Sequence, residues 1–152
     1  MRLVAFVCKI IALGQTVAEE AALLWASDHG ILTCRNTSTA FTWPPRLTGR
    51  EVSRRTAWLL ENVLQSEGSI LLTLNSALGP EQSKAIEFLG ANKKPFLHLW
   101  SSVPQVGLLA RSFLESHAVT ILNVVGSSRD TGEPIETFAR SVFEALLIST
   151  HV

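Results

Sequence analysis

Three polar segments of the sequence each lie between an apolar run and a helix-like pattern, and these segments are the best places for a ligand. They are Gly14-Gln15-Thr16, the stretch from Asn75 to Gln82 with Gly79 inside it, and the stretch from Gly126 to Arg129. The first N–H groups of a helix are unpaired and carry a partial positive charge, so each segment is able to hold an anionic group. The chain contains no GxGxxG and no GxxxxGK(S/T) phosphate motif. Each segment on its own is therefore at least as compatible with an ordinary turn.

Four side chains are further candidates for contacts with such a ligand, three from other parts of the sequence and one from the third segment. Arg54, Arg55 and Arg129 are able to clamp a phosphate through paired N–H groups, although arginines on a helix surface are more often simply solvated. Asn123 lies inside an apolar run and needs a hydrogen-bond partner when it is buried. That partner is either a neighbouring loop or a ligand.

No catalytic or metal centre is predicted. His98 has no histidine, cysteine or aspartate at a spacing that suits a metal, which favours a structural histidine. Three serines are considered as nucleophiles: Ser66, Ser127 and Ser128. No histidine is placed to suggest a triad with any of them, and the chain has no GxSxG motif. Glu87 is expected on the solvated face of a helix. We therefore expect a binding protein in preference to an enzyme.

Alternating strands and helices must position these candidates. Strands are predicted at 3–13 (one or two), 31–34, 69–74, 95–100 and 119–125, and helices at 17–30, 50–65, 83–92, 104–117 and 133–148. Thr16 suits the N-cap of the first helix, and Glu19 three residues later would complete a capping box. Residues 35–49 follow neither pattern and are expected to form a loop.

This alternation predicts the fold. Strands that alternate with helices of this length form βαβ units around a mainly parallel sheet, and right-handed connections place helices on both faces. The expected fold is an α/β, Rossmann-like three-layer sandwich with a mainly parallel sheet of at least five strands, formed by a single domain over residues 1–152. In such sheets ligands bind beyond the carboxyl ends of the strands. Gly14, Asn75 and Gly126 should all lie at that edge.

Five segments in order along the chain resemble motifs of the putative molybdenum carrier family. Lys9–Val17 is similar to the strand and loop around SGGQTG, Arg55–Trp58 to RTEWN, Ser66–Ser69 with the following apolar run to SDGTLIF, Lys93–Leu99 to GKPCLHI, and Leu122–Gly126 to LNVAG. The resemblance implies a Rossmann-like fold related to nucleotide-sensing and lysine-decarboxylase-like proteins. It also implies that the ligand is the molybdenum cofactor (molybdopterin) or a nucleotide.

The sequence departs from the family pattern in its loops. Leu13 and Val17 stand where the family's first loop has glycines, and Gly79-Pro80-Glu81-Gln82 stands in place of a TGGT-like stretch. A bulky Val17 limits how closely a phosphate can approach the backbone. Pro80 removes an N–H donor, and Glu81 places a negative charge where an anion would sit. The fold therefore carries over better than the ligand, and we expect weak binding.

The composition narrows the function classes. Thirteen Lys and Arg residues balance thirteen Asp and Glu residues, so nucleic acid is not an expected partner. Apolar residues make up 47% of the chain and charged residues 17%, which is typical of a globular protein. The first apolar run is short and is interrupted by Lys9, so we expect no membrane segment. Cys8 and Cys34 form no CxxC motif and are expected to be buried thiols of a cytoplasmic protein.

Three functions stay open. The first is a non-catalytic carrier of the molybdenum cofactor or a related nucleotide-like anion, as the resemblance implies, with the N–H groups of Gln15 and Thr16 as donors. The others are a nucleotide or phosphoribosyl hydrolase, and a degenerate family member that acts only through protein–protein contacts. We also expect a homo-oligomer, at least a dimer, because helices with Trp25 and Trp58 and a loop with Trp43 offer large apolar surfaces.

Overall fold

The computed structural model describes residues 2–5, 7–35 and 51–150 of the chain. Its elements in chain order are β1 (Arg2–Ala5), β2 (Lys9–Ala12), α1 (Val17–Asp28), β3 (Leu32–Arg35), α2 (Glu51–Gln65), β4 (Gly68–Thr73), α3 (Pro80–Ala91), β5 (Phe96–Trp100), α4 (Val106–Ser116), β6 (Ile121–Val125), α5 (Glu133–Glu144) and β7 (Leu147–Thr150). Strands and helices alternate from β2 to α5, as predicted. None of the helices in these described ranges is long and apolar enough to cross a membrane.

A five-stranded sheet with the order β3-β2-β6-β4-β5 forms the centre of the molecule, and all of its pairs are parallel. β4 is buried along its whole length, because parallel sheets are covered on both faces and their central strands are continuously apolar. The prediction of an α/β fold with a parallel sheet of at least five strands is confirmed.

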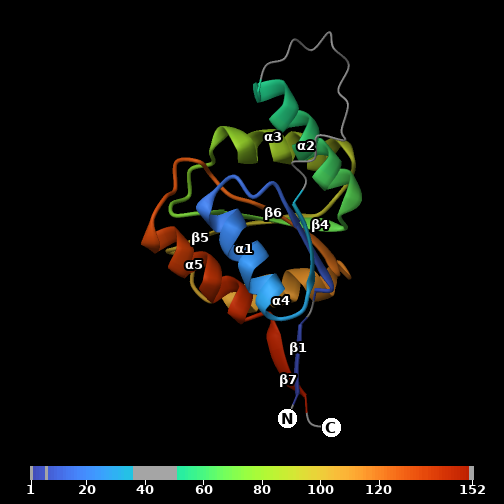
Figure 1. Cartoon of the computed structure of the whole chain (residues 1–152), viewed down its shortest axis with the longest axis vertical. Helices are drawn as coiled ribbons and strands as arrows, with labels where there is room; N and C mark the ends of the chain where they lie inside the picture. Colours follow the sequence, from blue (N-terminus) through green and yellow to red (C-terminus); the bar gives the residue numbers. More distant parts are fainter. Residues whose placement is uncertain (1, 6, 36–50, 151–152) are drawn as a thin grey trace.

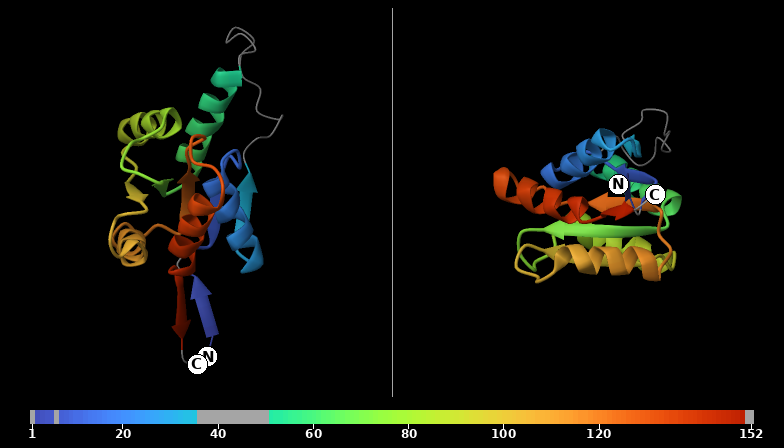
Figure 2. Two further views of the ribbon diagram at one scale, coloured as in Figure 1. Left: turned by 90° about the vertical axis from the view of Figure 1, so that its left-hand side faces the viewer. Right: turned by 90° about the horizontal axis from the view of Figure 1, so that it is seen from below.

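Helices cover both faces of this sheet. α1, α4 and α5 pack on one face, and α2 and α3 pack on the other. In Figure 1, α2 and α3 lie above the strands, α4 and α5 lie towards the bottom, and α1 crosses in front of the sheet; Figure 2 gives two further views. The three layers of the Rossmann-like sandwich are therefore present.

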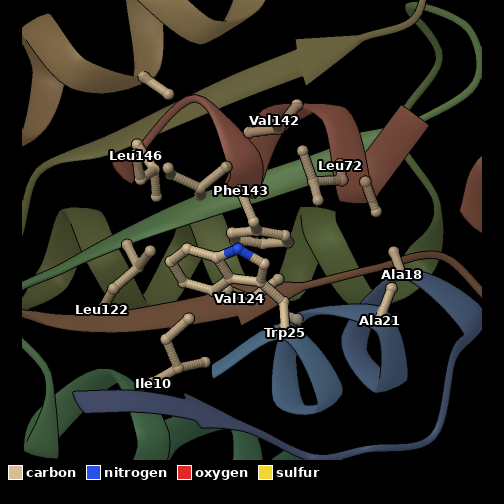
Figure 3. Packing of buried hydrophobic residues seen from close by; sticks show 14 of the residues in the cluster. Ile10, Ala18, Ala21, Trp25, Leu72, Leu122, Val124, Val142, Phe143 and Leu146 are labelled. Atoms are coloured by element: carbon tan, nitrogen blue, oxygen red, sulfur yellow. The ribbon is translucent and has the colours of Figure 1, made fainter. Parts of the chain in front are cut away.

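The larger core lies between the sheet and the helices α1, α4 and α5. Trp25 of α1 stacks on Phe143 of α5, with ring centroids 5.6 Å apart, and both rings lie over the strand residues Ile10, Leu122 and Val124 (Figure 3). Only 4% of Trp25 is exposed, because its own chain covers it. Trp25 therefore does not supply the exposed apolar surface on which we based the expected oligomer, and Trp43 lies outside the described residues.

A smaller core lies between the sheet and the helices α2 and α3. Leu59 and Val63 of α2 and Leu89 of α3 pack there against Leu71 and Val125 of the sheet. The helical spacing of Leu59 and Val63 places both on the buried face of α2. This core ends at the carboxyl edge of the sheet, directly beneath the loops described below.

The predicted C-terminal helix is too long. α5 ends at Glu144, and residues 147–150 form β7, which pairs antiparallel with β1. The two strands extend as a ribbon away from the body of the molecule, with Arg2 paired opposite Thr150 (Figure 1). Arg111 of α4 donates from Nε to the Ala145 carbonyl over 2.6 Å, so a side chain of another helix bonds the end of α5. β-branched Ile148 and Thr150 then suit a strand once β1 provides a partner.

The two cysteines are less buried than predicted. Cys8 is exposed and Cys34 is half-buried. Cys8 precedes β2 at the amino end of the sheet, and Cys34 lies in the edge strand β3, where only one neighbouring strand covers it. An apolar run does not by itself distinguish a central strand from an edge strand.

Candidate functional site

The three predicted loops meet at the carboxyl edge of the sheet. Gly14 closely follows β2, Asn75 closely follows β4, and Gly126 directly follows β6. The prediction that these residues share one edge is confirmed. Gly14 adopts a φ of 72°, a left-handed conformation that favours glycine, and so turns the chain from β2 towards α1.

The loop between β2 and α1 is closed by side chains of the first helical turn. Thr16 is the N-cap of α1, as predicted, and its Oγ1 accepts a hydrogen bond from the Glu19 N–H over 3.2 Å. A capping box would direct the Glu19 carboxylate to the N–H of Thr16 itself. Instead, Oε1 of Glu19 accepts from the N–H of Gln15 over 3.0 Å. The carboxylate therefore holds the loop that precedes the cap.

The same carboxylate also binds a second loop. Oε2 of Glu19 accepts a hydrogen bond from the N–H of Gly126 over 2.9 Å, between residues 107 positions apart in the sequence. Only 2% of Glu19 is exposed. Burial raises the pKa of the Glu19 carboxyl above its ordinary value, the bonds from Gly126, Gln15 and Thr16 oppose this rise, and the negative charge of Glu81 adds to it.

Gly126 must be a glycine for these loops to approach each other. A Cβ atom at this position would overlap Oγ1 of Thr16 and lie 3.1 Å from the Cβ atoms of Thr16 and Ala18. The absence of a side chain brings the Gly126 N–H within reach of Glu19.

The loop between β4 and α3 is joined to the β6 loop in a similar way. Oε1 of Glu81 accepts from the N–H of Ser128 over 3.2 Å, and Oδ2 of Asp130 accepts from the N–H of Leu74 over 3.0 Å. Carboxylates of the chain thus accept from backbone N–H groups of all three loops. The predicted negative charge of Glu81 at this edge is therefore matched by a donor of the neighbouring loop.

α3 begins earlier than predicted, at Pro80 and not at Ser83. Gly79 is its N-cap, and Oε1 of Gln82 accepts from the Gly79 N–H over 2.8 Å. Proline is favoured at the first position of a helix, where the helix itself has no use for its missing N–H. Pro80 therefore starts this helix, and the prediction that the turn continues to Gln82 is wrong.

A cavity of about 430 Å³ opens between these loops and the helices α2 and α3. Its apolar residues are Leu13, Leu59, Pro80 and Val125, and its polar residues are Gln15, Thr16, Glu19, Thr56, Glu81, Lys84 and Ser128. Lys84 is partly exposed and forms an ion pair with Glu87 over 3.1 Å. A second hollow of about 510 Å³ runs between α1 and α5, and Gly14, Gln15 and Thr16 lie at its border.

Comparison with known proteins places this arrangement in a known fold. No protein-family profile and no curated protein matches the chain. A solved structure does match: that of the putative molybdenum carrier protein from Syntrophus aciditrophicus SB, with a TM-score of 0.73 and 23% sequence identity over 93% of this chain and 96% of the other. This chain therefore has the same fold as that protein. The resemblance noted in the sequence is thereby confirmed for the fold.

On this fold, the predicted ligand residues fall into two groups. Gln15 and Thr16 line the 430 Å³ cavity, whereas Gly79 and Gly126 belong to the loops at its edge. Oδ1 of Asn75 accepts from the Ala77 N–H of its own loop over 3.0 Å. Nη2 of Arg129 donates to the Ala77 carbonyl over 3.4 Å, so Arg129 bonds the neighbouring loop between β4 and α3.

The remaining predicted residues lie away from the loops or outside the description. Asn123 is buried within β6, where its Nδ2 donates to Oγ of Ser69 over 3.0 Å, and its Oδ1 has no hydrogen-bond partner among the described residues. Arg54 and Arg55 belong to α2, but their side chains fall outside the described part of the chain. His98 has the partner that a structural histidine requires, since its Nε2 lies 2.7 Å from Oγ1 of Thr73.

Glu19 is the important residue that sequence reasoning assigned too small a role. It was expected only as part of a cap, yet it joins two loops. Its position in the first turn of a helix, directly after a loop at the carboxyl edge, was the available sequence signal. From that position a carboxylate is able to accept hydrogen bonds from backbone N–H groups of its own loop and of the neighbouring loop. Ser128 lies in the predicted segment from Gly126 to Arg129, and Thr56 lies in the segment that resembles RTEWN, whereas no sequence signal indicated Lys84.

Proposed function

We propose that this protein binds a small ring-containing ligand in the 430 Å³ cavity without transforming it, and that the ligand is the molybdenum cofactor or a related nucleotide-like compound. The observation that carries this proposal is the position of the cavity. It lies at the carboxyl edge of an open α/β sheet, where such folds bind ligands, and its volume is in the range of small-molecule sites. The name of the structure with the same fold supports the choice of molybdenum cofactor.

The ring of such a ligand suits the cavity. Leu13, Leu59 and Val125 provide an apolar wall for a flat ring. Pterin and guanine rings carry an amino group beside a ring N–H, and a carboxylate accepts from both donors in parallel. Glu19 and Glu81 bring carboxylates to this cavity, although both already accept from backbone N–H groups.

The phosphate of such a ligand suits the loops less well. The N–H groups of Gln15 and Gly126 would be its natural donors, and both already donate to Glu19. Lys84 at the cavity provides a positive charge for a phosphate that stays outside the loops. This division supports a carrier with modest affinity. It also supports binding without catalysis, because the backbone holds both oxygens of the most buried acid.

Native mass spectrometry and a matched pair of variants test the proposal. We expect the purified protein to carry a pterin or nucleotide, and we expect neopterin or guanosine monophosphate to bind in calorimetric titrations. Thr56→Trp should fill the cavity and abolish binding, whereas Leu108→Trp, at an exposed position of α4, should leave binding unchanged. Equal binding by both variants would place the ligand elsewhere.

A protein that acts only through protein–protein contacts is the second candidate. The specific observation in its favour is that carboxylates of the chain already accept from N–H groups of all three loops. The same experiments separate the two functions. No co-purified ligand and no response to either compound at millimolar concentration would support the second candidate and exclude the first.

A further inference from the structure

The Glu19 carboxyl group lies where a bound anion would be expected. It accepts from Gln15, just before α1, and from Gly126, at the end of β6, over 3.0 and 2.9 Å. Backbone N–H groups near the start of a helix, supported by the helix dipole, form the usual protein site for phosphate, and Gln15 lies at such a place. Gly126 adds a second N–H group from the loop after β6. Here the chain supplies the acceptor itself, from a side chain that is almost wholly buried.

The local structure directs this side chain to its position. Thr16 caps α1 and accepts from the Glu19 N–H, so Glu19 lies in the first turn with its carboxyl group beside the preceding loop. Gly126 allows the second loop to approach Thr16 closely, because a Cβ atom there would overlap the Thr16 side chain. Both oxygens then each receive one N–H group. The arrangement needs residues from two distant parts of the chain.

We propose that Glu19 is a specificity-determining residue of the carboxyl-edge site: its side chain takes the place of a phosphate, so the site selects ligands by their ring and excludes phosphate from the two loops. This inference rests on the proposed function for the identity of the ring ligand. Its central claim, that Glu19 blocks an anion site, is independent of that ligand and can be tested with inorganic phosphate alone.

Removal of the carboxylate should create a phosphate site. In Glu19→Ala, the N–H groups of Gln15 and Gly126 lose their acceptor, and the charge that repels an anion from them disappears. A purely structural role for Glu19 would make the variant less stable but would not give it affinity for phosphate. Gain of binding is therefore the informative result.

Glu20 provides a matched control. It lies in the same first turn of α1 and carries the same charge, but it forms an ion pair with Arg35 at the surface. Glu20→Ala therefore changes the net charge and the charge near the helix start as Glu19→Ala does, while the buried contacts of Glu19 remain.

Phosphate titrations followed by amide NMR test the proposal in three proteins. We expect the Gln15 and Gly126 amide signals of Glu19→Ala to shift with saturation, at a phosphate affinity at least about tenfold above that of the wild type and of Glu20→Ala. Glu19→Gln, which keeps the shape of the side chain, should show a smaller gain and replaces Glu19→Ala if the latter does not fold.

The phosphate titration of the wild type tests the proposal even if the variants do not fold. Saturable phosphate shifts of its Gln15 and Gly126 signals, or equal affinity in the Glu19 and Glu20 variants, would overturn the proposal. The phosphate of guanosine monophosphate gains no loop contacts and only the positive charge of Lys84, so Lys84→Ala should bind guanosine and guanosine monophosphate with similar affinity. A preference of about tenfold or more for the phosphate form in Lys84→Ala would overturn the proposal too. If neither compound binds while Glu19→Ala gains phosphate, the proposed function fails and the role of Glu19 stands.

Discussion

Replacement of Gly126 by alanine tests whether close approach of two loops builds the site. The added Cβ atom would overlap Oγ1 of Thr16 and lie 3.1 Å from two further Cβ atoms. Crowding of this kind in a packed region costs about 1–3 kcal/mol. If the loops separate to relieve it, the bond from Gly126 to Glu19 is lost, which costs about 1.5–3 kcal/mol for a charged acceptor. Whichever of these two costs applies, we expect Gly126→Ala to lower the free energy of unfolding by about 1–3 kcal/mol.

Urea denaturation measures this change, and Gly90→Ala is its control. Gly90 lies in α3, and a Cβ atom there would meet no atom within 4 Å. Alanine in an open helical position should raise the free energy of unfolding by about 0.5–1 kcal/mol. A Gly126 variant as stable as the Gly90 variant would refute the close approach.

A double-mutant cycle identifies the crowding partner. Thr16→Ala alone should cost about 1 kcal/mol, because α1 loses its cap. Thr16→Ala combined with Gly126→Ala should cost less than the sum of the single changes, by about 0.5 kcal/mol or more, since the overlapping oxygen is absent. If the losses of unfolding free energy in the two single variants simply add in the double variant, Thr16 is not the residue that crowds position 126.

Three further predictions concern titration and assembly. Because burial raises the pKa of Glu19, the unfolding free energy of the wild type should fall relative to Glu19→Gln as the pH rises above 4.5, and a constant difference in pH-dependent denaturation would contradict this. The opposite pH dependence is expected for Glu67, because bonds from the N–H groups of Thr120 and Ile121 lower its pKa. The unfolding free energy of the wild type should therefore fall relative to Glu67→Gln as the pH falls below 4.5, and a difference that does not change with pH would show that these bonds are absent in solution. The chain should still be at least a dimer in light scattering, because Leu24, Leu32 and Leu108 are exposed although Trp25 is buried, and a mass of 16.6 kDa at micromolar concentration would exclude this.

Part of the candidate site at the carboxyl edge of the sheet could be predicted from the sequence. The loops at Gly14, Asn75 and Gly126 were predicted at one edge because the carboxyl ends of parallel strands meet there, and the structure places them there. The doubt about phosphate binding also came from the sequence, through Val17, Pro80 and Glu81. The stronger physical reason, the Glu19 carboxylate bonded to two of the loops, was not predicted.

The sequence by itself determined the fold class, the position of the ligand edge and most element boundaries. Those properties depend on local periodicity, on caps such as Thr16 and on short connections, all of which act within a few residues. Tertiary structure alone decided which N–H groups Glu19 binds, where Trp25 is buried and that residues 147–150 form a strand. Each of these outcomes depends on a partner that is distant in sequence. The order of the folded strands brings that partner close, and a local pattern of residue types does not contain this information.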